Sequence, residues 1–107
     1  MRRVSAALLA LVLPLLMQSP SSAAVDANCS YNGICLHGKV KVVKNFGDIK
    51  VMVVRNFPDL RVQKVKYFPE HCGQWQFVDN FPDFTIQYVN AFPDITIQYV
   101  KNFPGLP

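Results

Sequence analysis

The sequence contains few of the side chains from which catalytic and metal-binding sites are built. Its 107 residues include two histidines, His37 and His71, and three cysteines, and neither a C-x-x-C nor an H-x-x-x-H spacing occurs. Zinc sites usually show such spacings, and nucleophilic catalysis needs a nucleophile, a base and an orienting group. His71 and Cys72 are adjacent, so their side chains point in opposite directions in an extended segment. We therefore expect that the chain is no enzyme and holds neither a metal ion nor a cofactor.

The chain also lacks an apolar run that is long enough to cross a bilayer. The longest run, 4–17, follows the basic pair Arg2-Arg3 and precedes QSPSSAA, which ends in small residues. This layout is typical of a secretory signal, which we place at 1–24 with cleavage after Ala24 and with Ala27 as the second choice. We expect an exported protein, periplasmic or extracellular, that is not an integral membrane protein.

The excess of positive charge is smaller than the whole chain suggests. The formal charge falls from +4 to +2 without the two arginines of the predicted signal, because all seven acids come later. An exported chain with this charge is not expected to bind nucleic acid. The remaining charge is uneven: residues 39–67 carry eight Lys or Arg and two acids, whereas residues 68–107 carry one Lys and four acids. Such asymmetry can produce a bipolar surface for an anionic partner, although solubilising charge on alternate strand positions is the simpler interpretation.

An odd number of cysteines, Cys29, Cys35 and Cys72, is unusual for an oxidising compartment. A small exported domain gains stability from a disulfide, so we expect one. We predict the local pair Cys29–Cys35 within an N-terminal segment, 25–37, where Ser30, Asn32 and Gly33 would form the turn. Pairing of either cysteine with Cys72 would instead join this segment to the middle of the domain. One thiol is left over in every case.

The rest of the chain, 38–107, is a tandem repeat. Six phenylalanines are spaced 11, 11, 13, 11 and 11 residues apart, and each closes one unit: Phe46, Phe57, Phe68, Phe81, Phe92 and Phe103. The units read GKVKVVKNFGD, IKVMVVRNFPD, LRVQKVKYFPE, GQWQFVDNFPD, FTIQYVNAFPD and ITIQYVKNFPG, with His71-Cys72 inserted between the third and the fourth. Fixed periods of this kind indicate repeat architectures, so the repeat should be primarily a scaffold.

Each unit is predicted to be one short strand and one turn. β-Branched and aromatic residues dominate, and a proline or glycine in every unit excludes a long helix, which makes the fold all-β. Proline favours an extended conformation for the preceding Phe, and the acid after it is expected to cap its own turn rather than bind calcium. Apolar residues at positions one, three and five face one side of the strand, whereas the constant valine at six and the Phe at nine are also apolar. We therefore expect both strand faces to be buried in a wrapped structure, and two units could also form one flattened solenoid coil.

This layout is similar to that of the septoil-knot domains. The resemblance covers residues 38–107 and depends on six short strand-turn units, an insertion carrying a Gly and a Trp before the fourth unit, and closely matched IQYV units at the end. Many members end their turns in Ser-x-Ala-Asp where this chain has Phe-Pro-Asp. The resemblance implies a compact domain whose chain is threaded into a seven-crossing torus knot, and it implies no activity.

The second half contains the best candidates for ligand binding. Glutamine repeats at position four and an aromatic ring at position five, and stacked in register these rows would form an amide ladder beside an aromatic ladder. The predicted site residues are Trp75, Gln76, Gln87, Tyr88, Gln98 and Tyr99. Flat rings beside amides suit sugars, whereas the simpler interpretation places the rings in the core. We expect a non-enzymatic structural or interaction module, with a carbohydrate-binding module as the alternative, and with envelope glycan or another exported protein as partner.

Overall fold

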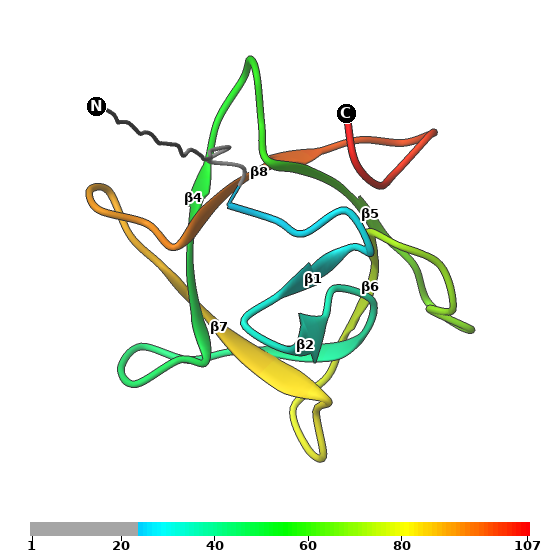
Figure 1. Ribbon diagram of the computed structural model, residues 1–107. Helices are drawn as coiled ribbons and strands as arrows, with labels where there is room; N and C mark the ends of the chain where they lie inside the picture. Colours follow the sequence, from blue (N-terminus) through cyan, green and yellow to red (C-terminus); the bar gives the residue numbers. More distant parts are fainter. Residues whose placement is uncertain (1–23) are drawn as a thin grey trace, which may run out of the picture.

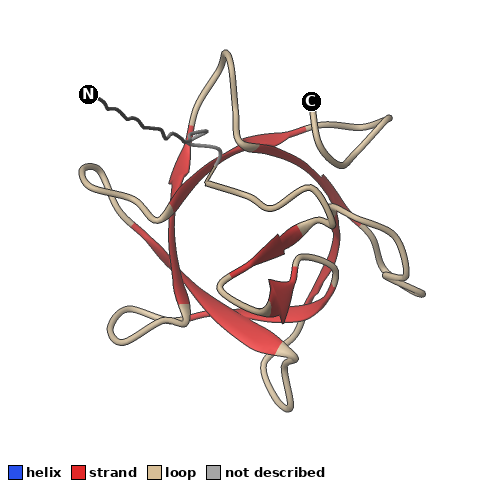
Figure 2. Cartoon of the chain, in the orientation of Figure 1, coloured by secondary structure: helices blue, strands red, loops and turns tan. Residues whose placement is uncertain are grey.

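The computed structural model describes residues 24–107, so almost all of the predicted signal segment 1–24 lies outside the described residues. All regular structure in the described part is β, which confirms the all-β prediction. A small antiparallel hairpin precedes a closed barrel of parallel strands (Figures 1 and 2). The hairpin consists of β1 (Ser30–Tyr31) and β2 (Ile34–Cys35). The barrel strands are β3 (Gly38–Val42), β4 (Ile49–Val53), β5 (Leu60–Lys64), β6 (Gln74–Phe77), β7 (Phe84–Tyr88) and β8 (Ile95–Tyr99).

The six repeats follow an interleaved path around the barrel, in the order β3-β6-β5-β8-β4-β7. The first three strands are two places apart in this ring, and the last three fill the gaps between them. A constant step of two places in a ring of six would return the chain to its first strand after three units. The step from β5 to β6 advances one place instead, and the His71-Cys72 insertion lies within that connection. The repeats therefore form a closed ring of strands and not the flattened solenoid coil that the sequence also allowed.

The barrel interior is filled by positions one and three of the repeats, because alternate side chains of a strand point to the same face. These residues include Val40, Ile49, Val51, Leu60, Val62, Trp75, Phe84, Ile86, Ile95 and Ile97, each at most 2% exposed. The Trp75 ring packs edge-on against Phe84, with centroids 5.6 Å apart. Its Nε1–H donates to the Leu36 carbonyl oxygen at 3.0 Å. The N-terminal segment therefore closes the end of the barrel at which the strands begin.

A disulfide joins this N-terminal segment to the repeat insertion. Cys29 is bonded to Cys72, with their Cα atoms 5.9 Å apart, and Cys35 is a free and exposed cysteine. The predicted Cys29–Cys35 pair is therefore wrong. In the hairpin, Cys35 lies opposite Ser30 and at the surface, whereas Cys29 is buried in the core cluster. Burial of Cys29 beside the β5–β6 connection, rather than proximity in the sequence, determines its partner.

Four of the five connections between barrel strands cross over the strand that lies between the two strands they join, and each of the four is bound to it. The Asp59 carboxylate accepts from the Thr96 amide at 2.8 Å, and the Asp59 amide donates to the Thr96 hydroxyl at 3.0 Å. Asp48 and Thr85 form the same reciprocal pair at 2.9 Å in both directions. The carboxylates of Asp83 and Asp94 accept from the amides of Lys39 and Lys50 at 2.8 and 2.7 Å, respectively. These acids bind a neighbouring strand instead of capping their own turns, so they fix the loops to the barrel.

Candidate functional site: an exposed phenylalanine rim

The predicted Gln and aromatic ladders do not form, because their strands are not neighbours. β6, β7 and β8 alternate with strands of the first half around the ring, so no two of them pair. Trp75 is fully buried and its indole nitrogen is already bonded, which removes it from any surface site. The interleaving also mixes the basic first half with the acidic second half, so the two halves do not form two poles.

The predicted glutamines support loops. The Gln87 side-chain oxygen accepts from the Gly47 amide at 3.3 Å, and the Gln98 side-chain nitrogen donates to the Arg55 carbonyl oxygen at 2.8 Å. Both bonds join a barrel strand to a loop far away in the sequence. Gln76 is partly buried on β6. These amides contribute to the rigidity of the loops that cross their strands.

Tyr88 and Tyr99 do meet, at the barrel end where the strands finish. Their hydroxyl oxygens are 2.5 Å apart, and the Lys64 ammonium lies 4.5 Å from the centroid of the Tyr99 ring. Burial, followed by the bond to Tyr88, raises the pKa of Tyr99 above its ordinary value. A shallow pocket of about 480 Å³ opens here, lined by Gln63, Lys64, Tyr99, Val100 and Lys101. This aromatic mouth is the part of the predicted sugar site that the fold brings together.

The largest departure from the sequence prediction is the phenylalanine at position nine. All six rings are exposed, at 98% for Phe46, 97% for Phe57, 77% for Phe68, 91% for Phe81, 93% for Phe92 and 85% for Phe103. The prediction that this position is buried is therefore wrong. The extended backbone predicted before proline is wrong as well, because each of the six has a positive φ of 54–59°. The left-handed conformation turns the chain sharply at each loop tip, and the ring points away from the barrel.

The constancy of this phenylalanine within the chain has no explanation in packing. Among the eleven repeat positions, only the valine at six and the Phe at nine are the same in all six units. The valines are partly buried, and their amides extend the barrel ladder; the Val43 amide, for example, donates to the Ile86 carbonyl oxygen at 2.9 Å. The phenylalanines instead occupy a backbone conformation that a bulky residue adopts at a cost of about 1–3 kcal/mol. Glycine or asparagine would adopt this conformation at a lower cost. Because phenylalanine nevertheless occupies the position in all six units, we infer that its aromatic ring is needed there.

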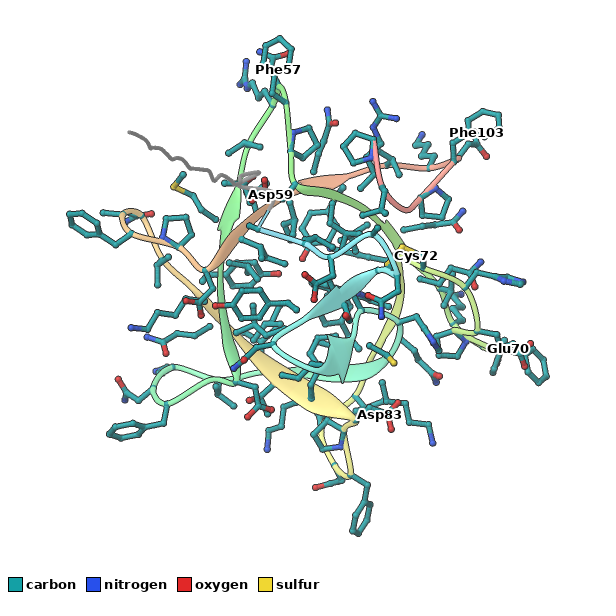
Figure 3. The ribbon with its side chains drawn as sticks, viewed as in Figure 1. Phe57, Asp59, Glu70, Cys72, Asp83 and Phe103 are labelled. Atoms are coloured by element: carbon teal, nitrogen blue, oxygen red, sulfur yellow. A yellow bond between two sulfur atoms is a disulfide. The ribbon has the colours of Figure 1, made fainter. Side chains whose placement is uncertain are left out.

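The six tips form a rim around the barrel (Figure 3). The loops radiate from the ring of strands, and the labelled rings of Phe57 and Phe103 lie at the outermost points of two neighbouring loops. We refer to the six phenylalanines at position nine as the phenylalanine rim. One feature of the sequence pointed to this rim, namely the phenylalanine that is constant in every turn. Because phenylalanine is apolar, the sequence alone favours burial of these rings over exposure.

Other chemistry-bearing side chains of the described residues are scattered. Residues 24–107 contain no group of three or more His, Cys, Asp or Glu that could hold a metal ion. The exposed Cys35 and the half-buried His37 line a hollow of about 680 Å³ beside Pro69, whose carbonyl oxygen is 3.1 Å from the His37 Nδ1 atom. No helix of this part of the chain has the length and hydropathy of a membrane span.

Comparison with known proteins gives one result. A search of curated proteins finds no match to the chain. The family described as the 7(1) septoil knot domain matches residues 33–107, which comprise the β2 strand, all six repeats and the end of the chain. The interleaved barrel with its crossing loops is a small structural β domain of the kind that this description implies. The chain belongs to the 7(1) septoil knot domain family.

Proposed function

We propose that the protein is an exported, non-enzymatic interaction module whose rigid barrel presents the phenylalanine rim to a partner. The observation that carries this proposal is the combination of constancy and exposure at position nine, where all six rings are at least 77% exposed. A single exposed apolar residue needs no explanation, but the same exposed ring at the same position of all six repeats does, and contact with a partner would explain it. The bonds between four of the turn acids and their neighbouring strands support the same role, because they hold four of the six tips in place before binding and so reduce its entropic cost.

Export is supported by the disulfide of the N-terminal segment, and the burial of Val25 bears on the cleavage position. The Cys29–Cys72 disulfide is compatible with an oxidising compartment. Val25, the first residue after the favoured cleavage position, belongs to the buried core cluster and is 5% exposed. Cleavage after Ala27 would remove this buried valine, which supports Ala24 as the cleavage position in this proposal. The disulfide is retained in both cases.

The proposal is tested by removing the rings without disturbing the loops. Asparagine tolerates a positive φ, so a variant with Phe→Asn at all six tips should keep the fold. We expect the full-length chain to be retained with the cell envelope and the six-tip variant to be released into the soluble fraction. A control variant, Val42→Ser with Val53→Ser, changes apolar residues that are 44% and 49% exposed away from the tips, and it should be retained. Equal distribution of wild type and six-tip variant would refute the proposal.

Carbohydrate binding is the second candidate, and the aromatic mouth favours it. Tyr88 is 44% exposed and its hydroxyl is joined to that of Tyr99, beside the pocket that Lys64 lines. Aromatic faces with adjacent donors suit sugar rings. Co-sedimentation of residues 25–107 with insoluble cell-wall glycan, at low and high salt, tests this candidate. Salt-resistant binding that Tyr88→Ala and Tyr99→Ala abolish would support it, and absence of binding by the folded wild type would refute it.

A further inference from the structure

The phenylalanine rim is not uniform, because its two halves differ in charge. Around the ring, the tips of the loop 54–59, the C-terminal segment 100–107 and the loop 65–73 are consecutive. The first crosses β8, the second crosses β5, and the third lies beside β6 and leads into it. We call this half, with its three strands, the basic sector. Figure 3 shows it from Phe57 through Phe103 to the loop that carries Glu70.

A count of charges separates the two halves. The basic sector carries five cationic side chains, Arg55, Arg61, Lys64, Lys66 and Lys101, against Asp59 and Glu70, which gives 5 − 2 = +3. The opposite half carries Lys39, Lys41, Lys44 and Lys50 against Asp48, Asp79, Asp83 and Asp94, which gives 4 − 4 = 0. Similar rings are thus presented on both halves, but only one half combines them with net positive charge.

A hollow beside Phe57 adds a polar site to the basic sector. It has a volume of about 470 Å³ and is lined by Arg55, Asn56, Phe57, Pro58, Arg61, Gln98 and Pro107. Two arginines therefore line one concave surface, directly beside a ring that is 97% exposed. Guanidinium groups bind phosphate oxygens in a fork geometry, so the hollow is suited to a phosphate group.

We propose that the basic sector binds the surface of an anionic phospholipid membrane. Phe57 and Phe103 enter the boundary between head groups and acyl chains, Arg55 and Arg61 hold a lipid phosphate, and Lys66 and Lys101 add attraction to the charged surface. Phenylalanine together with Lys and Arg is the combination found on peripheral membrane-binding surfaces. The inference rests on the proposed function of the rim and identifies its partner.

The exposure of the rings favours lipid over an acidic glycan or an acidic protein. A sugar stacks on one face of an aromatic ring and uses neighbouring donors, whereas phenylalanine has no polar atom and these rings are free on all sides. An acidic protein would explain the cations but would not need isolated apolar tips. Insertion into an apolar medium uses the whole ring. Neighbouring tips can reach one membrane surface together, while the tips of Phe46 and Phe81 lie on the opposite side of the ring.

Co-sedimentation with vesicles tests the inference, using the disulfide-bonded chain 25–107. Vesicles of phosphatidylcholine with about one third phosphatidylglycerol are compared with vesicles of phosphatidylcholine alone. Wild type should bind the anionic vesicles preferentially. Phe57→Asn with Phe103→Asn should weaken binding about a hundredfold, on the basis of roughly tenfold or more for each buried ring. The matched control, Phe46→Asn with Phe81→Asn, removes two neighbouring rings from the opposite half and should bind as wild type does.

Two further measurements separate insertion from simple attraction. Arg55→Gln with Arg61→Gln should weaken binding to anionic vesicles about 25-fold, at roughly fivefold for each cation, and should leave weak binding to neutral vesicles unchanged. Phe103→Trp places a fluorescent ring at the tip, while the native Trp75 remains buried. Its emission should shift to shorter wavelength with anionic vesicles, and that of Phe46→Trp should not.

The outcomes distinguish this inference from the proposed function. Absence of vesicle binding at low salt, or binding that both phenylalanine pairs weaken equally, would overturn the inference. Insertion would be overturned if salt abolished vesicle binding and the variant Phe57→Asn with Phe103→Asn still bound as wild type does. It would also be overturned if the chain bound an acidic glycan but no vesicles. The proposed function would still stand in each case if the six-tip variant lost its retention in the envelope. If that retention were unchanged, the proposed function itself would fail.

Discussion

Loss of the Cys29–Cys72 disulfide should remove a large share of the stability of the domain. The bond joins residues 43 positions apart, so it restricts a long segment of the unfolded chain. The loop-closure relation gives about 4 kcal/mol for a loop of this length. A domain of this size has a free energy of unfolding of roughly 4–12 kcal/mol, so reduction should cost at least a third of it.

The measurement uses the Cys35→Ser variant, which leaves one disulfide and no free thiol for exchange. Urea unfolding of the oxidised and the reduced protein, followed by far-ultraviolet circular dichroism, gives the two free energies of unfolding. We expect a difference of about 4 kcal/mol and a fall of about 20 °C in Tm. Reduction avoids the additional cost of a serine at the buried Cys29 position. The wild-type native chain should react with a thiol reagent once, at Cys35, and three reactive thiols would contradict the assigned pairing.

A difference below about 1 kcal/mol would refute this reasoning. It would mean that the disulfide removes little entropy from the unfolded chain. The cause could then be sought in the interleaved repeats, because an unfolded chain that stayed entangled would already restrict the segment between the two cysteines. Repeating the measurement after long incubation in urea would distinguish slow disentangling from a permanent restriction.

Asp59→Ala should cost about 1.5–3 kcal/mol, because it leaves the Thr96 amide without its charged acceptor, and a double-mutant cycle with Thr96→Ala should show coupling of about 1 kcal/mol; strictly additive losses would argue against the reciprocal pair. The raised pKa of Tyr99 means that the folded state keeps a proton that the unfolded state releases above pH 10. Its contribution to stability is complete below pH 10 and is lost as the pH rises towards the folded-state pKa. Tyr99→Phe should therefore flatten the fall in unfolding free energy between pH 9 and 11, and an unchanged fall would contradict the assignment. Unfolding in denaturant should be slow for a domain of this size, because four of the loops cross a strand that comes from a distant part of the sequence; stopped-flow traces that finish within milliseconds would contradict this prediction.

Much of the fold follows from local rules. The spacing of the six phenylalanines gives the repeat boundaries, and the alternation of apolar residues identifies positions one and three as the core. These predictions succeed because a strand exposes two faces with a period of two, whatever its neighbours are. The choice of neighbours is different. Nothing in the closely matched units FTIQYVNAFPD and ITIQYVKNFPG shows that β7 and β8 are separated by β4.

The candidate site is where reasoning from the sequence was least successful. The Gln and aromatic rows were predicted as neighbours because they are neighbours in the repeat, and the interleaved ring separates them. The six phenylalanines were predicted to be buried because they are apolar. In the structure each of the six has a left-handed backbone conformation at a loop tip, and its ring is exposed. Cys29 was paired with its nearest cysteine in the sequence for a similar reason.

By itself, the sequence determined that the chain is an all-β repeat with a predicted export signal and an insertion at its centre, because these properties depend on composition, period and length. Only the tertiary structure decided which strands touch, which cysteines pair and which aromatic rings are exposed. The physical reason is ring closure. A barrel of six strands traversed in steps of two must change its step once, and that single change at the insertion fixes every contact between residues that are distant in the sequence.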